Sequence, residues 1–246
     1  MKRCAILIAS PGEPGDGTDG TVVDVAVWRE YLTELVGGAW DHDEINTVFN
    51  PSRDKLASEL SKADGSDYAI VTFSGHGKLG VIDNEPTTML LTNESEPAIP
   101  YFALRPRSAR TLMVFDSCRC VSESILRKEA AERRVIISED IVRRDYRDFF
   151  EQQVLRTERG VITLFGCGIG EEARDWYSET MPGGLYTLAL LKGARSWYAR
   201  AASRQVLNVV QAHNDVKSDV TLRNPEQHPE VRHGRRLGVF PLAIKL

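Results

Sequence analysis

The sequence predicts an α/β fold built on a mainly parallel sheet of about six strands, with helices on both faces. Short apolar runs of strand composition alternate with helical patterns along most of the chain, and two of these runs end in polar elements rich in glycine or serine. Continuous apolar runs are typical of buried parallel strands, and strands that alternate with helices form a sheet covered on both sides. A chain of 246 residues suits one large core.

The N-terminal part of the chain starts this alternation. We expect a strand over residues 4–9, a helix over 22–36, a strand over 44–49 and a helix over 51–63. The first helix spaces its apolar residues by three and four positions, and the second has a proline in its first turn, where proline is favoured.

The rest of the chain continues the pattern around two central strands, 68–73 and 110–115, with a loop over 81–86 between them. The stretch 122–159 is dense in Arg, Glu and Asp. The elements expected after it are a strand over 161–165, helices over 185–200 and 204–213, and a last strand over 239–244.

The two central strands are followed by residues that carry chemistry. Ser74-Gly75-His76-Gly77 follows the first, and Asp116-Ser117-Cys118 follows the second. Ligands bind outside the carboxyl ends of the strands in open α/β sheets, so neighbouring strands would bring His76 and Cys118 to one crevice. A cysteine that attacks a carbonyl needs a base nearby, because a free thiol is only a few per cent ionised at neutral pH. The backbone amides of Gly77 and Cys118 would stabilise the oxyanion.

At these motifs the sequence resembles the caspase and metacaspase superfamily, whose members carry a Ser-Gly-His-Gly or similar element and, one strand later, an Asp-Ser-Cys element. The resemblance extends more weakly over most of the chain, from the strand expected at 4–9 to the stretch 183–190. It implies a caspase-like three-layer sandwich in a single domain, 1–246, with a large-subunit-like part (1–121), a charged connector (122–159) and a small-subunit-like part (160–246). It also implies a cysteine endopeptidase with a His76/Cys118 dyad. The chain departs from metacaspases after the nucleophile, where Arg119-Cys120-Val121 stands in place of His-Ser-Gly.

The metacaspase pattern implies an acidic pocket for a basic residue before the scissile bond. Asp116, Asp24 and Ser74 fall on the positions that line it. A buried pair of carboxylates can bind a guanidinium bidentately, which relieves their own repulsion. The alternative is that Asp116 only orients the nucleophile turn and that Asp24 is a surface charge on a helix.

Two further segments have an expected role in this resemblance. The connector contains Arg133-Arg134 and Arg143-Arg144, so Arg134 and Arg144 are candidate self-cleavage sites of a zymogen; the alternative is a pair of solvated helices whose arginines pair with Glu129, Glu132 and Asp140. The loop 166–176, including Trp176, is expected to form one wall of the substrate groove.

Other interpretations of the same residues are structural or concern another class of protein. A single histidine or buried cysteine is more often structural than catalytic, and we assign Cys4, Cys120 and Cys167 to packing. No cysteine and histidine spacing indicates zinc. Residues 75–80 fit a G-x-G-x-x-G dinucleotide fingerprint, but no helix is expected after them. A catalytically silent scaffold or a nucleotide-binding module is therefore the alternative function.

Composition indicates an intracellular enzyme. The net charge of −4 gives no general attraction to nucleic acid, no apolar run is long enough to span a membrane, and the start leads directly into a strand, so we expect a cytoplasmic protein. The expected partners are protein or peptide substrates and an activating protein. The residues themselves indicate no cofactor. The resemblance implies calcium as a candidate, because many metacaspases need it. By analogy, a regulatory protease in stress, cell-death or antiphage responses is expected.

Overall fold

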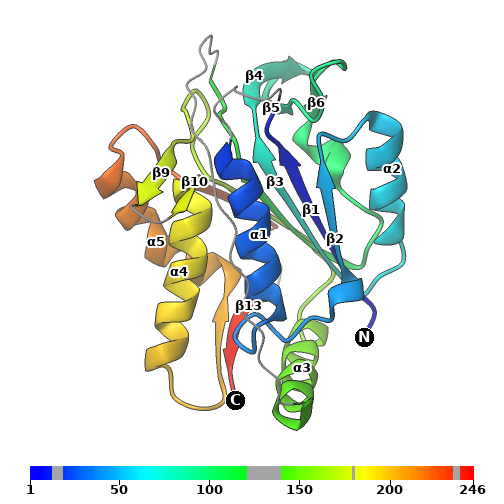
Figure 1. Cartoon of the computed structure of the whole chain (residues 1–246), viewed down its shortest axis with the longest axis vertical. Helices are drawn as coiled ribbons and strands as arrows, with labels where there is room; N and C mark the ends of the chain where they lie inside the picture. Colours follow the sequence, from blue (N-terminus) through cyan, green and yellow to red (C-terminus); the bar gives the residue numbers. More distant parts are fainter. Residues whose placement is uncertain (13–18, 121–139, 179–180, 235–238) are drawn as a thin grey trace.

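The computed structural model describes residues 1–12, 19–120, 140–178, 181–234 and 239–246. Its centre is a six-stranded sheet in the order β12-β8-β7-β3-β1-β2 (Figure 1). All neighbouring strands are parallel except β12, which runs antiparallel to β8. The predicted mainly parallel sheet of about six strands is thus confirmed. Its strands are β1 (Arg3–Ser10), β2 (Ile45–Phe49), β3 (Tyr68–Gly75), β7 (Arg110–Asp116), β8 (Gly160–Phe165) and β12 (Glu230–His233).

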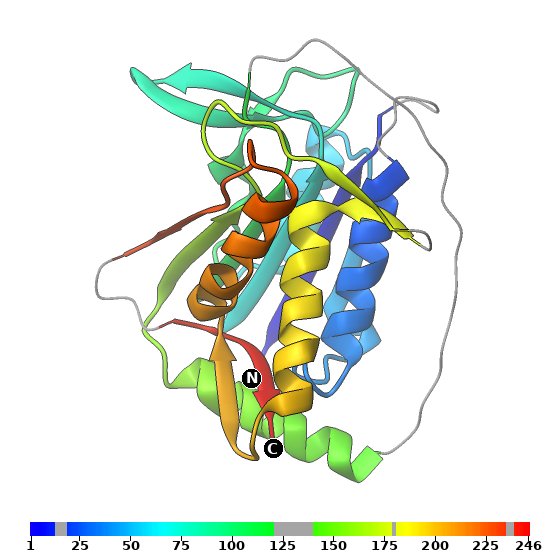
Figure 2. The ribbon, with the colours of Figure 1, turned by 90° about the vertical axis from the view of Figure 1, so that its left-hand side faces the viewer.

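Helices cover both faces of this sheet, as predicted (Figures 1 and 2). The alternation of side chains along β1 explains why: Ala5 and Leu7 belong to one buried cluster, while Ile6 and Ile8 belong to another on the opposite face. The first cluster lies under α1 (Asp19–Thr33), α4 (Leu185–Arg200) and α5 (Val209–Arg223), and the second lies under α2 (Arg53–Lys62) and η2 (Tyr101–Leu104). A further short helix is η1 (His42–Glu44).

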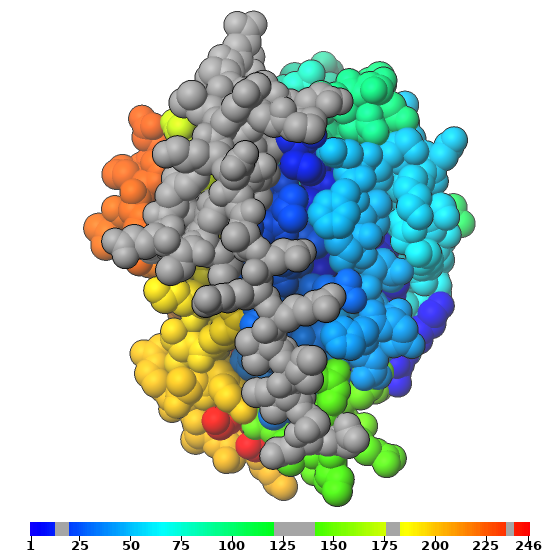
Figure 3. Space-filling model, viewed as in Figure 1, coloured from blue at the N-terminus to red at the C-terminus, as the bar shows by residue number. Residues whose placement is uncertain are grey.

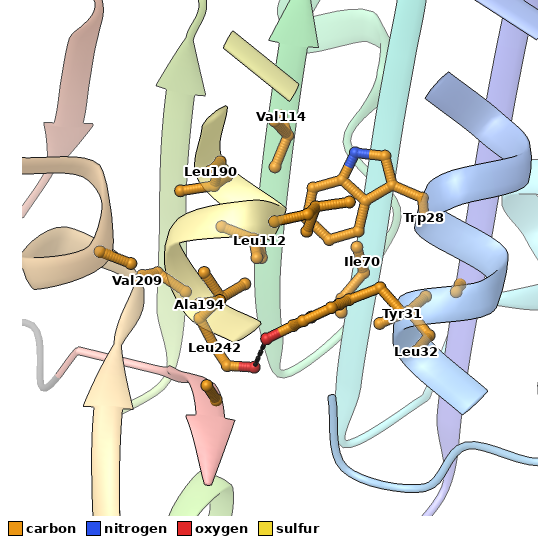
Figure 4. Packing of buried hydrophobic residues seen from close by; sticks show 14 of the residues in the cluster. Trp28, Tyr31, Leu32, Ile70, Leu112, Val114, Leu190, Ala194, Val209 and Leu242 are labelled. Atoms are coloured by element: carbon orange, nitrogen blue, oxygen red, sulfur yellow. Dashed lines mark hydrogen bonds between the residues drawn. The ribbon is translucent and has the colours of Figure 1, made fainter. Parts of the chain in front are cut away.

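The larger core lies between the sheet and the α1/α4 layer (Figure 4). Trp28 and Tyr31 of α1 pack toward the sheet residues Ile70 and Leu112. The hydroxyl of Tyr31, fully buried, donates to the backbone carbonyl of Leu242 (2.9 Å), which satisfies a polar atom in an otherwise apolar region.

The predicted loop over residues 81–86 is wrong. This segment lies in an antiparallel hairpin of β4 (Gly77–Ile82) and β5 (Glu85–Leu90), to which β6 (Ile99–Pro100) adds a third strand. Asp83 and Asn84, both with positive φ (51° and 63°), form the two-residue turn, a conformation that Asn and Asp tolerate better than most residues. The hairpin starts directly after His76, so it fixes the backbone beside that residue.

The C-terminal part differs from the prediction in several elements. The expected helix over 204–213 is in fact a strand, β11 (Gln205–Asn208), followed by α5, which begins at Val209 because the Asn208 side chain accepts from the amide of Gln211 (2.8 Å). The last strand, β13 (Pro241–Lys245), pairs with β11 outside the main sheet. The sixth strand of the main sheet is β12, and a hairpin of β9 (Asp175–Ser178) and β10 (Met181–Gly184) precedes α4.

The second half of the expected charged connector is a helix, α3 (Asp140–Leu155), with Tyr146, Phe150 and Val154 buried in the larger core. Arg143 donates to the backbone carbonyls of Thr33 and Trp40. The candidate cleavage site Arg144 is exposed on the same helix. Since proteases act on extended chain, the helical conformation argues against cleavage there. Arg134, Glu129 and Glu132 lie outside the described residues.

The space-filling view shows the N-terminal half of the chain, in blue and cyan, and the C-terminal part, in yellow and orange, on opposite sides of one face (Figure 3). Among the described residues, no helix has both the length and the apolar character needed to cross a bilayer.

Two leucines test the location of this core. Leu190 on α4 is fully buried in the larger cluster, whereas Leu222 on α5 is 82% exposed. We expect Leu190→Ala to lower the free energy of unfolding by about 2–5 kcal/mol, because it leaves a cavity. Leu222→Ala should change it by at most about 0.5 kcal/mol. Urea unfolding of both variants measures the difference, and equal losses would contradict the assigned core.

Candidate active site

The loops that carry His76 and Cys118 lie against each other at the carboxyl ends of β3 and β7. These strands pair in parallel as far as Ser74 and Asp116, so each of the two candidate catalytic residues stands two positions beyond that pair. A Cβ atom at Gly77 would collide with the carbonyl oxygen of Cys118 and lie 2.9 Å from Oγ of Ser117. Glycine is therefore required here for the close approach of the two loops. The structure brings the predicted dyad residues to one place.

Cys118 is partly buried, and its thiol lies beside the loop that follows β8. Its Sγ donates to the backbone carbonyl of Ala173 (3.6 Å). Burial raises the pKa of Cys118 to about 11; Cys120, Glu172 and Asp116 add to the rise, and the contact with Ala173 opposes it. In the free protein this shift favours the neutral thiol of Cys118 over the thiolate at neutral pH.

One ring nitrogen of His76 is buried away from solvent. Its Nε2 atom is buried and has no hydrogen-bond partner among the described residues, whereas the residue as a whole is partly exposed. Its backbone is fixed, since the amide of Leu91 donates to the carbonyl of His76 (3.0 Å).

The three residues predicted for the acidic pocket come together around Gly184. Ser74 Oγ donates to Oδ2 of Asp24 (2.5 Å), and the amide of Gly184 donates to Oδ1 of Asp24 (2.8 Å). A Cβ atom at Gly184 would overlap Oδ2 of Asp116 and lie 2.8 Å from Oδ2 of Asp24. Asp24 and Asp116, from α1 and β7, are 1% and 6% exposed. Asp24 is thus a buried member of the cluster, and the alternative of a helix-surface charge is wrong.

The first turn of α4 supplies donors to both acids. Its N-cap is Gly184, which has no side chain to cap the helix, and Oδ2 of Asp116 accepts from the amide of Thr187 instead (2.9 Å). Carboxylates at a helix N-terminus satisfy free N–H groups and interact favourably with the helix dipole. The acids therefore have a structural role in this position as well.

Even with these donors, the pair is held in an environment that disfavours negative charge. Burial raises the pKa of Asp116 to about 6, and burial together with the charge of Asp116 raises the pKa of Asp24 well above its ordinary value. Asp175 on β9 contributes to the rise in both groups and is a third carboxylate of this cluster. Sequence reasoning missed Asp175, although it lies in the loop predicted to border the substrate groove.

Arg119 is one of the residues at which the sequence departs from metacaspases. Its side chain is 1% exposed, and its guanidinium N–H groups have several hydrogen-bond acceptors. Its guanidinium donates to Oγ1 of Thr88 (2.8 Å), the carbonyl of Cys167 (2.8 Å) and Oε2 of Glu230 (2.7 Å), and lies over the ring of Phe165 (4.1 Å). A long cation is not expected to be buried from composition alone. Arg119 anchors the chain directly after the nucleophile.

The other cysteines lie in packed positions. Cys4, Cys120 and Cys167 are buried, and none of them is in a disulfide. Sγ of Cys167 donates to the carbonyl of Ser117 (3.3 Å), next to the nucleophile. In the described part of the chain, no group of three or more His, Cys, Asp and Glu side chains is arranged to hold a metal ion.

The model of the caspase domain matches residues 4–237, nearly the whole chain. The chain belongs to the caspase family. Membership supports a function of the cysteine-peptidase type in general. No curated protein sequence matches the chain.

Solved structures share the caspase fold. Caspase-1 of Spodoptera frugiperda superposes with a TM-score of 0.57 at 15% identity, over 96% of this chain and 90% of that one. A protein of Geobacter sulfurreducens superposes with a TM-score of 0.56 at 14% identity, over the full length of both chains. The predicted resemblance and fold are confirmed by the family and by these two structures.

The raised pKa of Cys118 predicts how its reactivity depends on pH. The rate of alkylation by iodoacetamide at Cys118 should rise about tenfold per pH unit between pH 7 and pH 10, because only the thiolate reacts. Mass spectrometry of the labelled peptide measures this rate, and Cys118→Ala is the control that loses the label. A rate already constant at pH 7 would indicate a preformed thiolate.

Proposed function

We propose that this caspase-family protein is a cysteine endopeptidase that cleaves after arginine and, more weakly, after lysine. The observation that carries the proposal is the buried pair of carboxylates, Asp24 and Asp116, around Gly184. Asp116 lies two residues before Cys118, the proposed nucleophile. A cation is the group that best complements two carboxylates held in a dry site.

The roles of the dyad follow from its chemistry. His76 takes the proton of Cys118 as the Sγ–C bond forms, and it then protonates the amine that leaves when the peptide bond breaks. His76 next removes a proton from water, whose oxygen attacks the thioester and restores the thiol. The amides of Gly77 and Cys118 are assigned to the oxyanion in both steps. The close contact between the loops supports this assignment, since both amides belong to adjoining residues of the crevice.

Arginine is preferred over lysine because of shape. A planar guanidinium can donate to two carboxylates at once, whereas an ammonium interacts as a point charge. Ser74 holds Asp24 in place through a 2.5 Å hydrogen bond, so the acids are oriented before a substrate binds.

The dyad is tested by removing each member. Cys118→Ala should abolish hydrolysis of arginyl peptides while keeping the melting temperature, because a methyl group replaces a thiol of similar size. His76→Ala should lower kcat/KM by about 10²–10⁴, since proton transfer is lost. Turnover of a fluorogenic peptide measures both. Full activity of Cys118→Ala would identify another nucleophile.

The pocket is tested with peptides that differ only in the residue before the scissile bond. The protein should cleave after Arg faster than after Lys, and Asp116→Asn should lose this selectivity by more than about tenfold in kcat/KM, which corresponds to about 1.4 kcal/mol. Asp54→Asn on α2, remote from the cluster, is the matched control. Cleavage only after Asp would reject the pocket.

The pocket also predicts a dependence of ligand binding on pH. Because the folded-state pKa of Asp116, about 6, lies above its ordinary value of 3.8, the stability that this group contributes is present below pH 3.8 and lost as pH rises through 6. A bound cation reverses this loss. We expect benzamidine to raise the melting temperature more at pH 8 than at pH 5. An equal rise at both values would contradict the assignment.

We also place this activity in regulation, in stress, cell-death or antiphage responses, by analogy with the family. The charged connector supports this role, because a cut in it would alter the chain that follows Cys118. Of the two candidate self-cleavage sites, Arg134 is favoured over Arg144, which lies on α3. Activation by a protein partner is the other route.

A further inference from the structure

A buried glutamine joins the loop beside the nucleophile to the segment between α5 and β12. Gln227 is fully buried. Its Nε2 donates to the carbonyl of Gly166 (2.8 Å), and its Oε1 accepts from the backbone amide of Arg174 (3.1 Å) and from Nδ2 of Asn224 (3.3 Å). The two ends of the loop 166–174 are therefore tied to a single side chain. Burial of an amide is costly unless such bonds are made.

The next residue ties the middle of the same loop. The amide of His228 and its Nδ1 atom contact the two carboxylate oxygens of Glu171 (2.7 and 2.8 Å). The same carboxylate accepts from the amide of Gly168 (2.8 Å). The backbone carbonyl of Glu171 in turn accepts from the amide of Arg119 (2.8 Å), directly after the nucleophile.

The third contact comes from the first residue of β12. Oε2 of Glu230 accepts from the guanidinium of Arg119 (2.7 Å). The segment 227–230 thus reaches the nucleophile from two directions. It holds Arg119 on the chain after Cys118, and through the loop it holds Ala173, whose carbonyl accepts from Sγ of Cys118.

We propose that Gln227, His228 and Glu230 form a polar clamp that positions Cys118, with Gln227 as its central positioning residue. The expected effect of the clamp on turnover rests on the proposed function. Its effect on the position of Cys118 does not depend on peptide hydrolysis. The clamp makes none of the hydrogen bonds that hold the acidic pocket, since Asp24 and Asp116 are held by Ser74, Gly184 and Thr187. The two sites adjoin at Gly166, where a Cβ atom would lie 2.7 Å from Oδ1 of Asp116.

This separation gives the clamp a distinct experimental result. When the loop is released, Ala173 no longer covers the thiol, so Cys118 becomes more exposed and reacts faster with iodoacetamide. At the same time the thiol loses its fixed position relative to a bound peptide, so turnover falls. Binding of a small cation to the acidic pocket stays as it was.

The test uses Gln227→Met, which keeps the volume of the side chain and removes its hydrogen bonds. We expect kcat for an arginyl peptide to fall about 10- to 100-fold, because a misplacement of about 1 Å has effects of that size. Alkylation of Cys118 should become several-fold faster at fixed pH, and the benzamidine dissociation constant should stay within about twofold of its original value. Melting curves check that the variant folds.

Two further variants complete the experiment. His228→Ala, at a side chain that is 49% exposed, should change kcat and alkylation in the same directions by a smaller factor. Glu226→Gln, at the exposed residue just before the clamp, is the matched control and should change neither. Should Gln227→Met fail to fold, His228→Ala decides the question.

Unchanged alkylation of Cys118 in folded Gln227→Met and His228→Ala would overturn the clamp. Loss of benzamidine binding together with loss of turnover would also overturn it, since the effect would then be a general distortion. If the unmodified protein cleaves no arginyl peptide while Gln227→Met still accelerates alkylation, the proposed function fails and the clamp stands.

Discussion

The burial of Asp24 and Asp116 against the first turn of α4 is the contact on which the site and much of the fold depend. It joins four elements that are far apart in the sequence: α1, the ends of β3 and β7, and the start of α4. The helix has no capping side chain of its own, so the acids satisfy its free amides, and the amides in turn hold the acids in a dry place. Gly184 is required at the centre, because any side chain would occupy the position of the carboxylates.

Much of this arrangement could be predicted from the sequence, because it depends on local patterns. Continuous apolar runs that end in polar residues predict β3 and β7. Because the ends of parallel strands meet at one edge of a sheet, the sequence also predicts that the loops of His76 and Cys118 adjoin. Asp116 lies at the end of such a run, but its place in the acidic pocket follows from the family pattern and not from the run itself. Asp24 was found only through the family pattern, since one carboxylate on a helix carries no local sign that it will be buried.

Most of the errors have one physical cause: partners that lie far away in the chain. The hairpin is the exception, because β4 and β5 are neighbours in the sequence. Residues 81–86 are mostly exposed and have weak apolar alternation, so the Asp83-Asn84 turn is the local feature that indicates the hairpin. The helix predicted over β11 is wrong, because pairing with β13, some 35 residues later, decides the conformation of this segment. The burial of Arg119 and Gln227 depends on contacts with Glu230 and Gly166, which no local pattern contains.

The electrostatics of the site connect specificity to reactivity. Burial keeps Cys118 a neutral thiol, and the negative charge of Asp116 raises its pKa further. In the proposed complex, the guanidinium of a substrate neutralises the acid pair. The negative charge that raises the pKa of Cys118 is then compensated at the same moment that the peptide carbonyl arrives. In this proposal a basic residue in the pocket activates the nucleophile as well as orienting the substrate, whereas a neutral residue in the same pocket leaves the buried acids without a cation to pair with. On this argument the free protein is protected from adventitious alkylation, and discrimination against neutral side chains comes from the chemical step in addition to binding.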